Sequence, residues 1–173
     1  MICGTYGRFD FHIRHIIDII GRKNEIQKIS TLSVLILAQQ TLFITDAFMD
    51  IDPTMEQIVE TTLAAAKQIE LFGIKPKVAL LSHSNFGSSN SESALKIREA
   101  VTFIHRHFPE VVIDGELQAD FALNRTMLAK EFPFSKLNGK KVNVLIFPNL
   151  DAANITYKLM KQEDEVESIG PIM

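Results

Sequence analysis

Polar side chains that could bind an anion follow a short apolar run, Val78–Leu81, in the middle of the chain. The residues concerned are Ser82, Ser84, Asn85, Gly87 and Ser88. In a parallel α/β sheet, ligands bind beyond the carboxyl ends of the strands, and a helix N-terminus offers unpaired N–H groups to an anion. The segment therefore predicts contact with an anionic ligand such as a phosphate. The alternative is a turn and helix cap in which the same residues serve only the backbone.

His83 lies between two of these serines, a combination that suggests a nucleophile with its base. Adjacent residues of a strand point to opposite faces of a sheet, so the ring could not easily reach Ser82 or Ser84. The chain also lacks the G-x-S-x-G turn that presents a nucleophilic serine in α/β hydrolases. The sequence therefore assigns no catalytic residue to this segment.

A second polar group, Asp114, Glu116 and Asp120, follows an expected strand at residues 111–113. Carboxylates this close together could bind a divalent cation or act as general bases. No histidine or further carboxylate cluster completes a coordination shell, so no metal is expected. In the alternative, the segment is a solvated turn in which Asp114 caps the loop and Gly115 supplies an unusual backbone angle.

A third polar group, Asn149, Asp151 and Asn154, follows the expected strand 142–147. Asp151 has an alternative role as the N-cap of the next helix. Because each of the three groups directly follows a strand, we expect them to gather at one edge of the sheet and to form one ligand-binding site.

The elements that must position these groups are short β-type runs alternating with longer helical patterns. This alternation predicts an α/β fold of three layers, with a mainly parallel sheet between helices. Expected strands are residues 32–38, 42–45, 78–81, 111–113 and 142–147, of which the first two form a hairpin. Expected helices are residues 11–20, 54–72, 122–131 and 153–161, and one between Ser91 and Pro109. The helix 54–72 has two candidate caps, Asp52 before Pro53 or a Thr54–Gln57 capping box.

The composition excludes several classes of protein. The chain has 173 residues, 46% of them apolar, and 18 basic against 21 acidic residues give a net charge of −3. Without a basic excess, no nucleic-acid partner is expected. The longest nearly pure apolar run, residues 32–38, is too short to span a bilayer, so no membrane partner is expected. A single cysteine, the lack of a signal peptide and the lack of a G-x-G-x-x-G motif favour a cytoplasmic protein without a dinucleotide cofactor of its own.

The polar segments resemble the phosphate acetyltransferase/butyryltransferase family. The resemblance rests on residues 76–89, 114–120 and 147–154, together with Asp52-Pro53 and Ile169-Gly-Pro, which occur in the family's order and with similar spacing. The forms Ser-His-Ser-Asn-Phe-Gly-Ser and Phe-Pro-Asn-Leu-Asp-Ala-Ala-Asn are most similar to the C-terminal domain of hybrid NADP-dependent malic enzymes. Stand-alone phosphotransacetylases usually differ at the positions of His83, Asn85 and Asn149.

The resemblance implies a fold similar to one subdomain of the isocitrate/isopropylmalate dehydrogenases, in which two α/β subdomains enclose a cleft. In phosphotransacetylases that cleft holds CoA and acetyl phosphate, and the protein is a dimer. In hybrid malic enzymes the same domain is associated with regulation by acetyl-CoA and with oligomer assembly. Acetyl-CoA or acetyl phosphate is therefore the implied ligand.

Residues 1–173 resemble a single partial domain, the second subdomain of the family. The Ser-Arg-Gly catalytic motif of phosphotransacetylases follows the Gly-Pro-Ile near the end of this chain, and malate and NADP bind to a separate N-terminal domain. The apolar pattern of residues 168–173 stops abruptly, as expected of a truncated or split gene, and a partner chain could complete the cleft. We therefore expect no catalysis by the chain alone. The alternative is a non-catalytic remnant or interaction module that acts only by self-association.

The residues themselves also predict a homodimer. The segment near the N-terminus is apolar on nearly every side, unlike a helix with one buried face. Its apolar residues are Phe9, Phe11, Ile13, Ile16, Ile17, Ile19 and Ile20. Together with the aliphatic hairpin of residues 32–45, this segment could be buried at a two-fold interface of about 800 Å² per partner.

Overall fold

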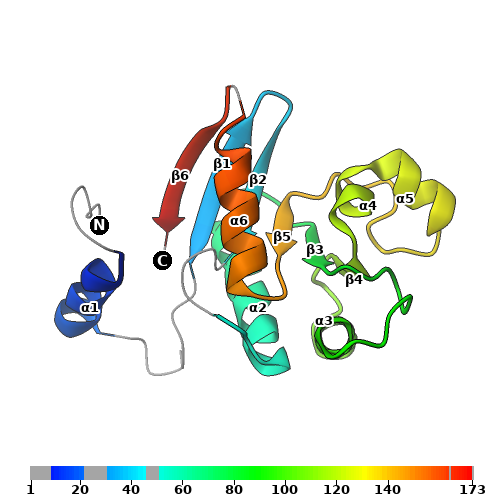
Figure 1. Cartoon of the computed structure of the whole chain (residues 1–173), viewed down its shortest axis with the longest axis horizontal. Coiled ribbons are helices and arrows are strands. Elements are labelled where there is room, and N and C mark those ends of the chain that lie inside the picture. Colours follow the sequence, from blue (N-terminus) through cyan, green and yellow to red (C-terminus); the bar gives the residue numbers. More distant parts are fainter. Residues whose placement is uncertain (1–8, 22–30, 46–50, 164, 173) are drawn as a thin grey trace.

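The computed structural model describes residues 9–21, 31–45, 51–163 and 165–172 (Figure 1). The strands are β1 (Leu32–Leu37), β2 (Gln40–Thr45), β3 (Val78–Leu81), β4 (Ile113–Leu117), β5 (Val144–Ile146) and β6 (Glu167–Ile172). The helices are α1 (Phe9–Ile20), α2 (Met55–Leu71), α3 (Glu92–His107), α4 (Ala119–Leu123), α5 (Arg125–Glu131) and α6 (Leu150–Met160). The expected α/β class is confirmed.

The strands form one six-stranded mixed sheet in the order β4-β3-β5-β2-β1-β6. Neighbours from β4 to β2 are parallel, whereas β1 is antiparallel to both β2 and β6, so the expected hairpin is present. Because β4, β3 and β5 are adjacent and parallel, the chain leaves all three at the same edge of the sheet. We call this edge, formed by the ends of β3, β4 and β5, the carboxyl edge.

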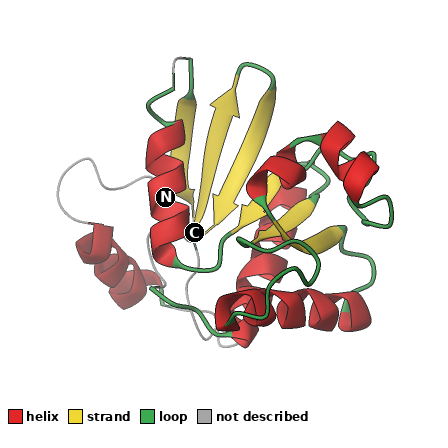
Figure 2. Ribbon diagram, turned by 45° about the vertical axis from the view of Figure 1, so that its right-hand side comes forward, coloured by secondary structure: helices red, strands yellow, loops and turns green. Residues whose placement is uncertain are grey.

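Helices cover both faces of the sheet, which makes the three layers visible in Figure 2. On one face, Val78 and Leu80 of β3 lie in an apolar core with α2 and α3. On the other face, Ala79 and Leu81 lie in a second core with α4, α5 and α6. Alternate side chains of β3 therefore pack in two different cores, as expected of an apolar strand that is covered by helices on both faces.

Strand β4 is irregular, and its irregularity decides where the carboxylates of this segment point. Leu80 of β3 pairs with Gly115 and Leu81 pairs with Leu117, so Glu116 is an extra residue in a β-bulge. Ile113 packs in the α2–α3 core, but Leu117, four positions later, packs in the core on the opposite face. In a regular strand both would face the same way. The expected strand 111–113 followed by a solvated turn is wrong, because residues 113–117 form a buried strand.

The two longest helices begin at side-chain caps. Thr54 caps α2 through a complete capping box with Gln57, so of the two candidates Thr54 is the N-cap and Asp52 is not. Asp52 instead forms an ion pair with Lys96 on α3. Ser91 caps α3 by accepting a hydrogen bond from the Ala94 N–H. Both caps satisfy backbone donors that the first helical turn leaves unpaired.

Two expected helices differ from those observed. The expected helix 122–131 is divided into α4 and α5, because the side chain of Asn124 accepts hydrogen bonds from the N–H groups of Thr126 and Met127 and starts a new helix. The expected helix 153–161 begins earlier, at α6, and its N-cap is Asn149. Asp151 lies in the first turn of α6, so its expected role as the cap is wrong.

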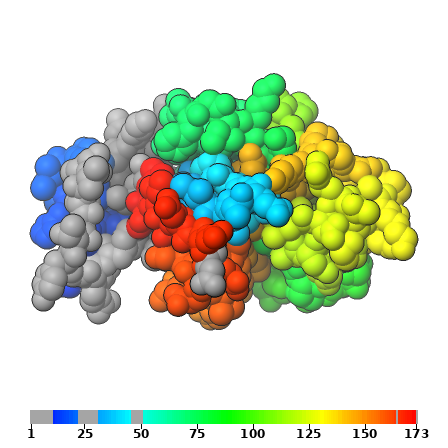
Figure 3. Space-filling view, turned by 90° about the horizontal axis from the view of Figure 1, so that it is seen from above, coloured from blue at the N-terminus to red at the C-terminus, as the bar shows by residue number. Residues whose placement is uncertain are grey.

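The β6 end of the molecule carries the remaining elements. Strand β6 pairs with β1, and Figure 3 shows it beside the β1–β2 hairpin. Helix α1 stands apart from the other described elements in the ribbon views (Figure 1). Its Ile19 and Ile20 side chains are 83% and 64% exposed, whereas Ile13 is buried. The side chain of Phe9, which the sequence placed in the same apolar set, lies outside the described part of the chain. Among the described residues, none of the helices is long and apolar enough to cross a membrane.

Candidate functional site

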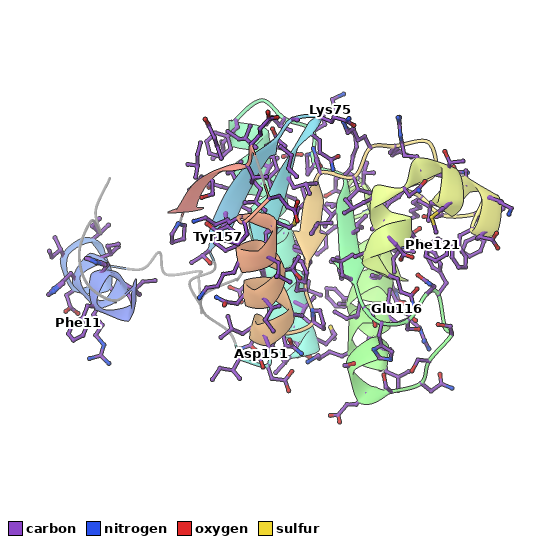
Figure 4. All side chains as sticks on the ribbon, turned by 45° about the horizontal axis from the view of Figure 1, so that its top comes forward. Phe11, Lys75, Glu116, Phe121, Asp151 and Tyr157 are labelled. Atoms are coloured by element: carbon purple, nitrogen blue, oxygen red, sulfur yellow. The ribbon has the colours of Figure 1, made fainter. Side chains whose placement is uncertain are left out.

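The carboxylate of Glu116 lies at the centre of a buried polar network at the carboxyl edge, between β4 and α3 (Figure 4). Its Oε1 atom accepts hydrogen bonds from the Ser84 hydroxyl at 2.8 Å and from the Gly87 N–H at 2.7 Å. Both donors belong to residues 82–91, which connect β3 to α3 and which we call the β3–α3 loop. One carboxylate therefore ties this loop to the neighbouring strand.

Arg98 of α3 supplies the positive charge that Glu116 requires. Its Nη2 donates to Oε1 of Glu116 at 2.9 Å and its Nε donates to Oε2 at 3.1 Å, a bidentate geometry. Burial raises the pKa of Glu116, but hydrogen bonds from Arg98, Gly87 and Ser84 outweigh burial and hold the pKa below its ordinary value. The hydrogen bonds to Glu116 in turn raise the pKa of Arg98. The pair is therefore ionised at neutral pH.

The hydroxyl groups of the β3–α3 loop are occupied within the loop. Because the Ser84 hydroxyl gives its single proton to Glu116, its oxygen can only accept, and it receives the Ser89 N–H at 3.0 Å and the Ser88 hydroxyl at 3.1 Å. Ser88 accepts in turn from the Asn85 N–H, and Ser82 accepts from the Ser84 N–H. In these contacts the serines serve the backbone and one another, as in the alternative that the sequence left open.

Asn85 has a free donor near this network. Its Oδ1 accepts from the Gln118 N–H at 2.7 Å, which fixes the side chain to the end of β4. Its amide nitrogen makes no hydrogen bond with any of the described residues. Gln118 also donates to the His83 carbonyl, so the loop and β4 are joined at two points. Asn85 is therefore a predicted site residue whose donor remains available to a ligand.

His83 is exposed and contacts serines other than its neighbours. Its Nε2 lies 3.2 Å from the Ser89 hydroxyl and 3.2 Å from the Ser91 hydroxyl. Ser82 and Ser84 do not take part in these contacts, as expected from the alternation of side chains. The contacts hold the start of α3 and do not form a catalytic triad with the serines beside His83.

An aromatic cluster covers the outer side of the loop. Phe86, whose φ of +43° lies in the left-handed region, packs its ring 5.0 Å from those of Phe132 and Phe134, measured between centroids. Phe121 joins the cluster through Phe132. Phe134 is 68% exposed, so the loop is held from inside by Glu116 and from outside by rings that reach the surface.

Asp114 does not belong to this site. Its carboxylate accepts from the Ser135 hydroxyl at 2.8 Å and from the Lys136 N–H at 2.7 Å. Residue 137, next to these donors, packs in the core on the α4–α6 face, so Asp114 points away from α3. The bulge at Glu116 is the reason that two carboxylates two positions apart serve opposite faces. The expected grouping of Asp114 with Glu116 is wrong.

The third predicted group lies at the same edge but serves mainly its own helix. Asn149 accepts from the Ala152 N–H and caps α6, and Asp151 is exposed in the first turn (Figure 4). Asn154 is half-buried within α6. Hydrogen bonds join the first group directly to Glu116, and that of Asn149 lies within its own helix.

Two further observations bear on ligands. Among the described residues, no group of three or more His, Cys, Asp or Glu side chains could hold a metal ion. A shallow pocket of about 240 Å³, lined partly by Lys77, Lys141 and Asn143, lies where the parallel strands begin. It is therefore at the edge opposite the predicted site and contains none of the predicted residues.

Arg98 was missed by the sequence analysis, although a signal was present. It lies seven residues after the N-cap Ser91, and side chains of a helix lean toward its N-terminus. An arginine at that position reaches back toward the β3–α3 loop. What the sequence could not show was the buried carboxylate that would meet it.

Comparison with known proteins places this geometry in a family. The model of the family described as "Phosphate acetyl/butaryl transferase" matches residues 1–173. The chain belongs to the phosphate acetyltransferase/butyryltransferase family. It is 42% identical over 173 residues to the NAD-dependent malic enzyme of Rhizobium meliloti, and 40% identical to the NADP-dependent malic enzyme of Haemophilus influenzae.

Solved structures of the family agree with the fold. The chain superposes on a phosphotransacetylase from Streptococcus pyogenes with a TM-score of 0.86 and 29% identity, covering 98% of this chain and 52% of that one. For the EutD phosphotransacetylase from Staphylococcus aureus the TM-score is 0.84 and the identity 31%, covering 92% and 49% of the two chains. The chain spans about half of these phosphotransacetylases, and the matched region covers 100% of this chain but only 22% and 23% of the two malic enzymes.

Proposed function

We propose that this phosphate acetyltransferase-like domain binds acetyl-CoA or acetyl phosphate at its carboxyl edge. The observation that carries the proposal is the β3–α3 loop, held rigidly by Glu116, with the Asn85 amide left free beside it. An amide donor fixed at the carboxyl edge, on the loop that leads to α3, suits a phosphate or thioester oxygen. The name that several relatives carry, phosphate acetyltransferase, supports a ligand of this class.

The bound ligand acts as a regulator and the chain alone is inactive. The reason is that the Ser-Arg-Gly motif implied by the family resemblance is absent from the sequence, and a catalytic constellation loses most of its rate when one member is missing. A partner chain that supplies the rest of the cleft would restore the catalytic activity. The fold would then correspond to one subdomain of a cleft such as that of the isocitrate/isopropylmalate dehydrogenases.

The same chain associates as a homodimer. Support comes from α1, whose exposed Phe11, Ile19 and Ile20 side chains present an apolar surface beyond the edge of the sheet. Ile36 of the hairpin is also exposed. Apolar side chains gathered in this way favour a protein partner over water.

Calorimetric titration of the purified chain with acetyl-CoA and with acetyl phosphate tests the ligand. We expect saturable binding to wild type and a loss of at least tenfold in affinity for Asn85→Asp. That variant keeps the oxygen that accepts from Gln118 but places a negative charge where the amide donor was. A negative charge at this position would repel an anionic ligand.

The matched control is Asn124→Asp. It introduces the same charge at another asparagine whose side-chain oxygen accepts hydrogen bonds from backbone N–H groups. Aspartate and asparagine are equally good N-cap residues, so the helix cap should be kept. Its affinity should equal that of wild type. Absence of saturable heat from wild type with both ligands, up to millimolar concentration, would remove the proposed ligand.

A further inference from the structure

We infer that Glu116 is the anion around which the β3–α3 loop is built, and that it is a positioning residue for the ligand site rather than a ligand-binding one. The inference rests on the proposed function, because the ligand site that it positions is the one beside Asn85. The groups that converge on Glu116 are those that proteins use for a bound phosphate: a serine hydroxyl, a glycine N–H and a guanidinium.

The geometry shows that these donors are fully used. Three of them reach the same oxygen, Oε1, at distances between 2.7 and 2.9 Å, which is typical of charge-assisted hydrogen bonds. Arg98 also donates to the Ser89 carbonyl at 2.7 Å, so its guanidinium bridges the carboxylate and the loop. An incoming anion could reach Ser84 or the Gly87 N–H only by displacing a buried carboxylate that already has its counter-ion.

A continuous series of hydrogen bonds leads from Glu116 to the backbone N–H of Asn85, the residue whose side-chain amide is free. Glu116 accepts from Ser84, Ser84 accepts from Ser88, and Ser88 accepts from the Asn85 N–H. The backbone of Glu116 contributes as well, since its carbonyl accepts from the Phe86 N–H at 2.9 Å. Glu116 therefore fixes three consecutive residues of the loop: Asn85 through Ser84 and Ser88, and Phe86 and Gly87 through direct hydrogen bonds.

The backbone of β4 is shaped so that Glu116 can reach the loop. The bulge turns Glu116 toward α3, and Gly115 permits the close approach of β4 to β3. A Cβ atom at position 115 would lie 2.5 Å from the Leu80 carbonyl oxygen, and its φ of +151° is unfavourable for other residues. Glycine at position 115 and glutamate at position 116 therefore act together.

The test compares two carboxylates of one strand. Glu116→Gln keeps the shape of the side chain but removes the charge that holds the Gly87 N–H and Arg98. Asp114→Asn is the matched control, because Asp114 is also buried on β4 and accepts a comparable set of hydrogen bonds on the other face. We expect acetyl-CoA affinity to fall at least tenfold in Glu116→Gln and less than twofold in Asp114→Asn. Equal losses in the two variants would overturn the inference.

Amide hydrogen exchange at Gly87 tests the same inference without any ligand. We expect at least tenfold faster exchange in Glu116→Gln and no change in Asp114→Asn, because only Glu116 accepts from this N–H. If wild type does not bind acetyl-CoA but exchange at Gly87 responds as stated, the proposed ligand fails and the role of Glu116 in fixing the loop remains. Unchanged exchange at Gly87 in Glu116→Gln overturns that role.

Rescue by a small carboxylate separates positioning from general stability. Glu116→Ala leaves a space and removes the carboxylate to which Ser84, Gly87 and Arg98 donate, and formate can fill that space. We expect formate, compared with chloride at equal ionic strength, to raise the Tm of Glu116→Ala and to slow its Gly87 exchange, with no effect on wild type. If Glu116→Ala does not fold, Arg98→Lys is used instead, because it keeps the positive charge and loses the bidentate contact with Glu116. Unchanged amide exchange at Gly87 in Arg98→Lys would also contradict the inference.

Discussion

Glu116 and Asp114 lie two positions apart on β4, and each carboxylate is held by donors from a different helical layer. Glu116 joins the strand to α3 through Arg98, whereas Asp114 joins it to the segment that follows α5. Both are buried, and a buried carboxylate is tolerated only where donors or a counter-ion replace its water. The two residues therefore secure the two faces of one strand, and only Glu116 is connected to the candidate ligand site.

The ionisation of Glu116 makes folding stability depend on pH. Its pKa in the folded protein is below the ordinary value of 4.5, so the carboxylate form favours the folded state. This contribution is complete above pH 4.5 and is lost as the pH falls through the lower, folded-state pKa. We expect Glu116→Gln to reduce the free energy of unfolding by about 2 kcal/mol at pH 7 and by less at pH 3.

Urea denaturation of wild type and Glu116→Gln at both pH values measures the difference. Lys130→Gln is a suitable control, because its ion pair with Glu131 is exposed and such pairs contribute little. A difference between wild type and Glu116→Gln that stays constant from pH 7 to pH 3 would contradict the assigned ionisation.

At the scale of the elements, the sequence identified those whose patterns are regular. The 3–4 spacing of apolar residues located α3, and the apolar runs located β3 and the hairpin. It ended the strand of β4 at residue 113, because Asp114 and Glu116 are polar and were placed after the strand, whereas in the folded chain both are buried within it and their partners come from distant segments. It also joined α4 and α5, since one asparagine that caps a new helix is a weak signal beside a continuous helical pattern.

The two caps that the sequence proposed for α2 can be distinguished by stability. The Thr54 hydroxyl accepts from the Gln57 N–H, and the Thr54 N–H donates to Oε1 of Gln57 in the capping box. Thr54→Ala should therefore lower the free energy of unfolding by about 1 kcal/mol. Asp52 has an exposed carboxylate paired with Lys96, so Asp52→Ala should cost only about 0.5 kcal/mol. Thermal or urea unfolding of the two variants decides between them, and equal losses would contradict the assignment of Thr54.

At the scale of the molecule, the order of the strands could not be read from the sequence, although it determines the site. Strand β5 lies between β3 and β2 in the sheet but comes after β4 in the chain. The parallel pairing of β4, β3 and β5 brings their carboxyl ends to one edge, as the polar residues after each strand indicated. The sequence could not show how far each group takes part, because that depends on the bulge in β4 and on hydrogen bonds between segments about 30 residues apart.

The exposed residues of α1 lead to a prediction for the assembly as a whole. Ile19 and Ile20 are 83% and 64% exposed on a helix that stands apart from the rest of the described structure. Burying apolar area stabilises an association by about 25 cal/mol per Å², so a second copy that covers α1 would form a stable dimer. We expect light scattering to give about twice the chain mass of 19.5 kDa for wild type.

Replacing both α1 residues, Ile19→Lys with Ile20→Lys, should return the mass to 19.5 kDa, because two charges would have to be buried at the interface. The matched control is Leu71→Lys with Phe72→Lys, which alters two exposed apolar residues at the end of α2. That control should remain dimeric. If α1 forms the interface, the first pair of substitutions abolishes association and the second does not; a wild-type mass of 19.5 kDa throughout the micromolar range would show that the exposed face of α1 binds no second copy.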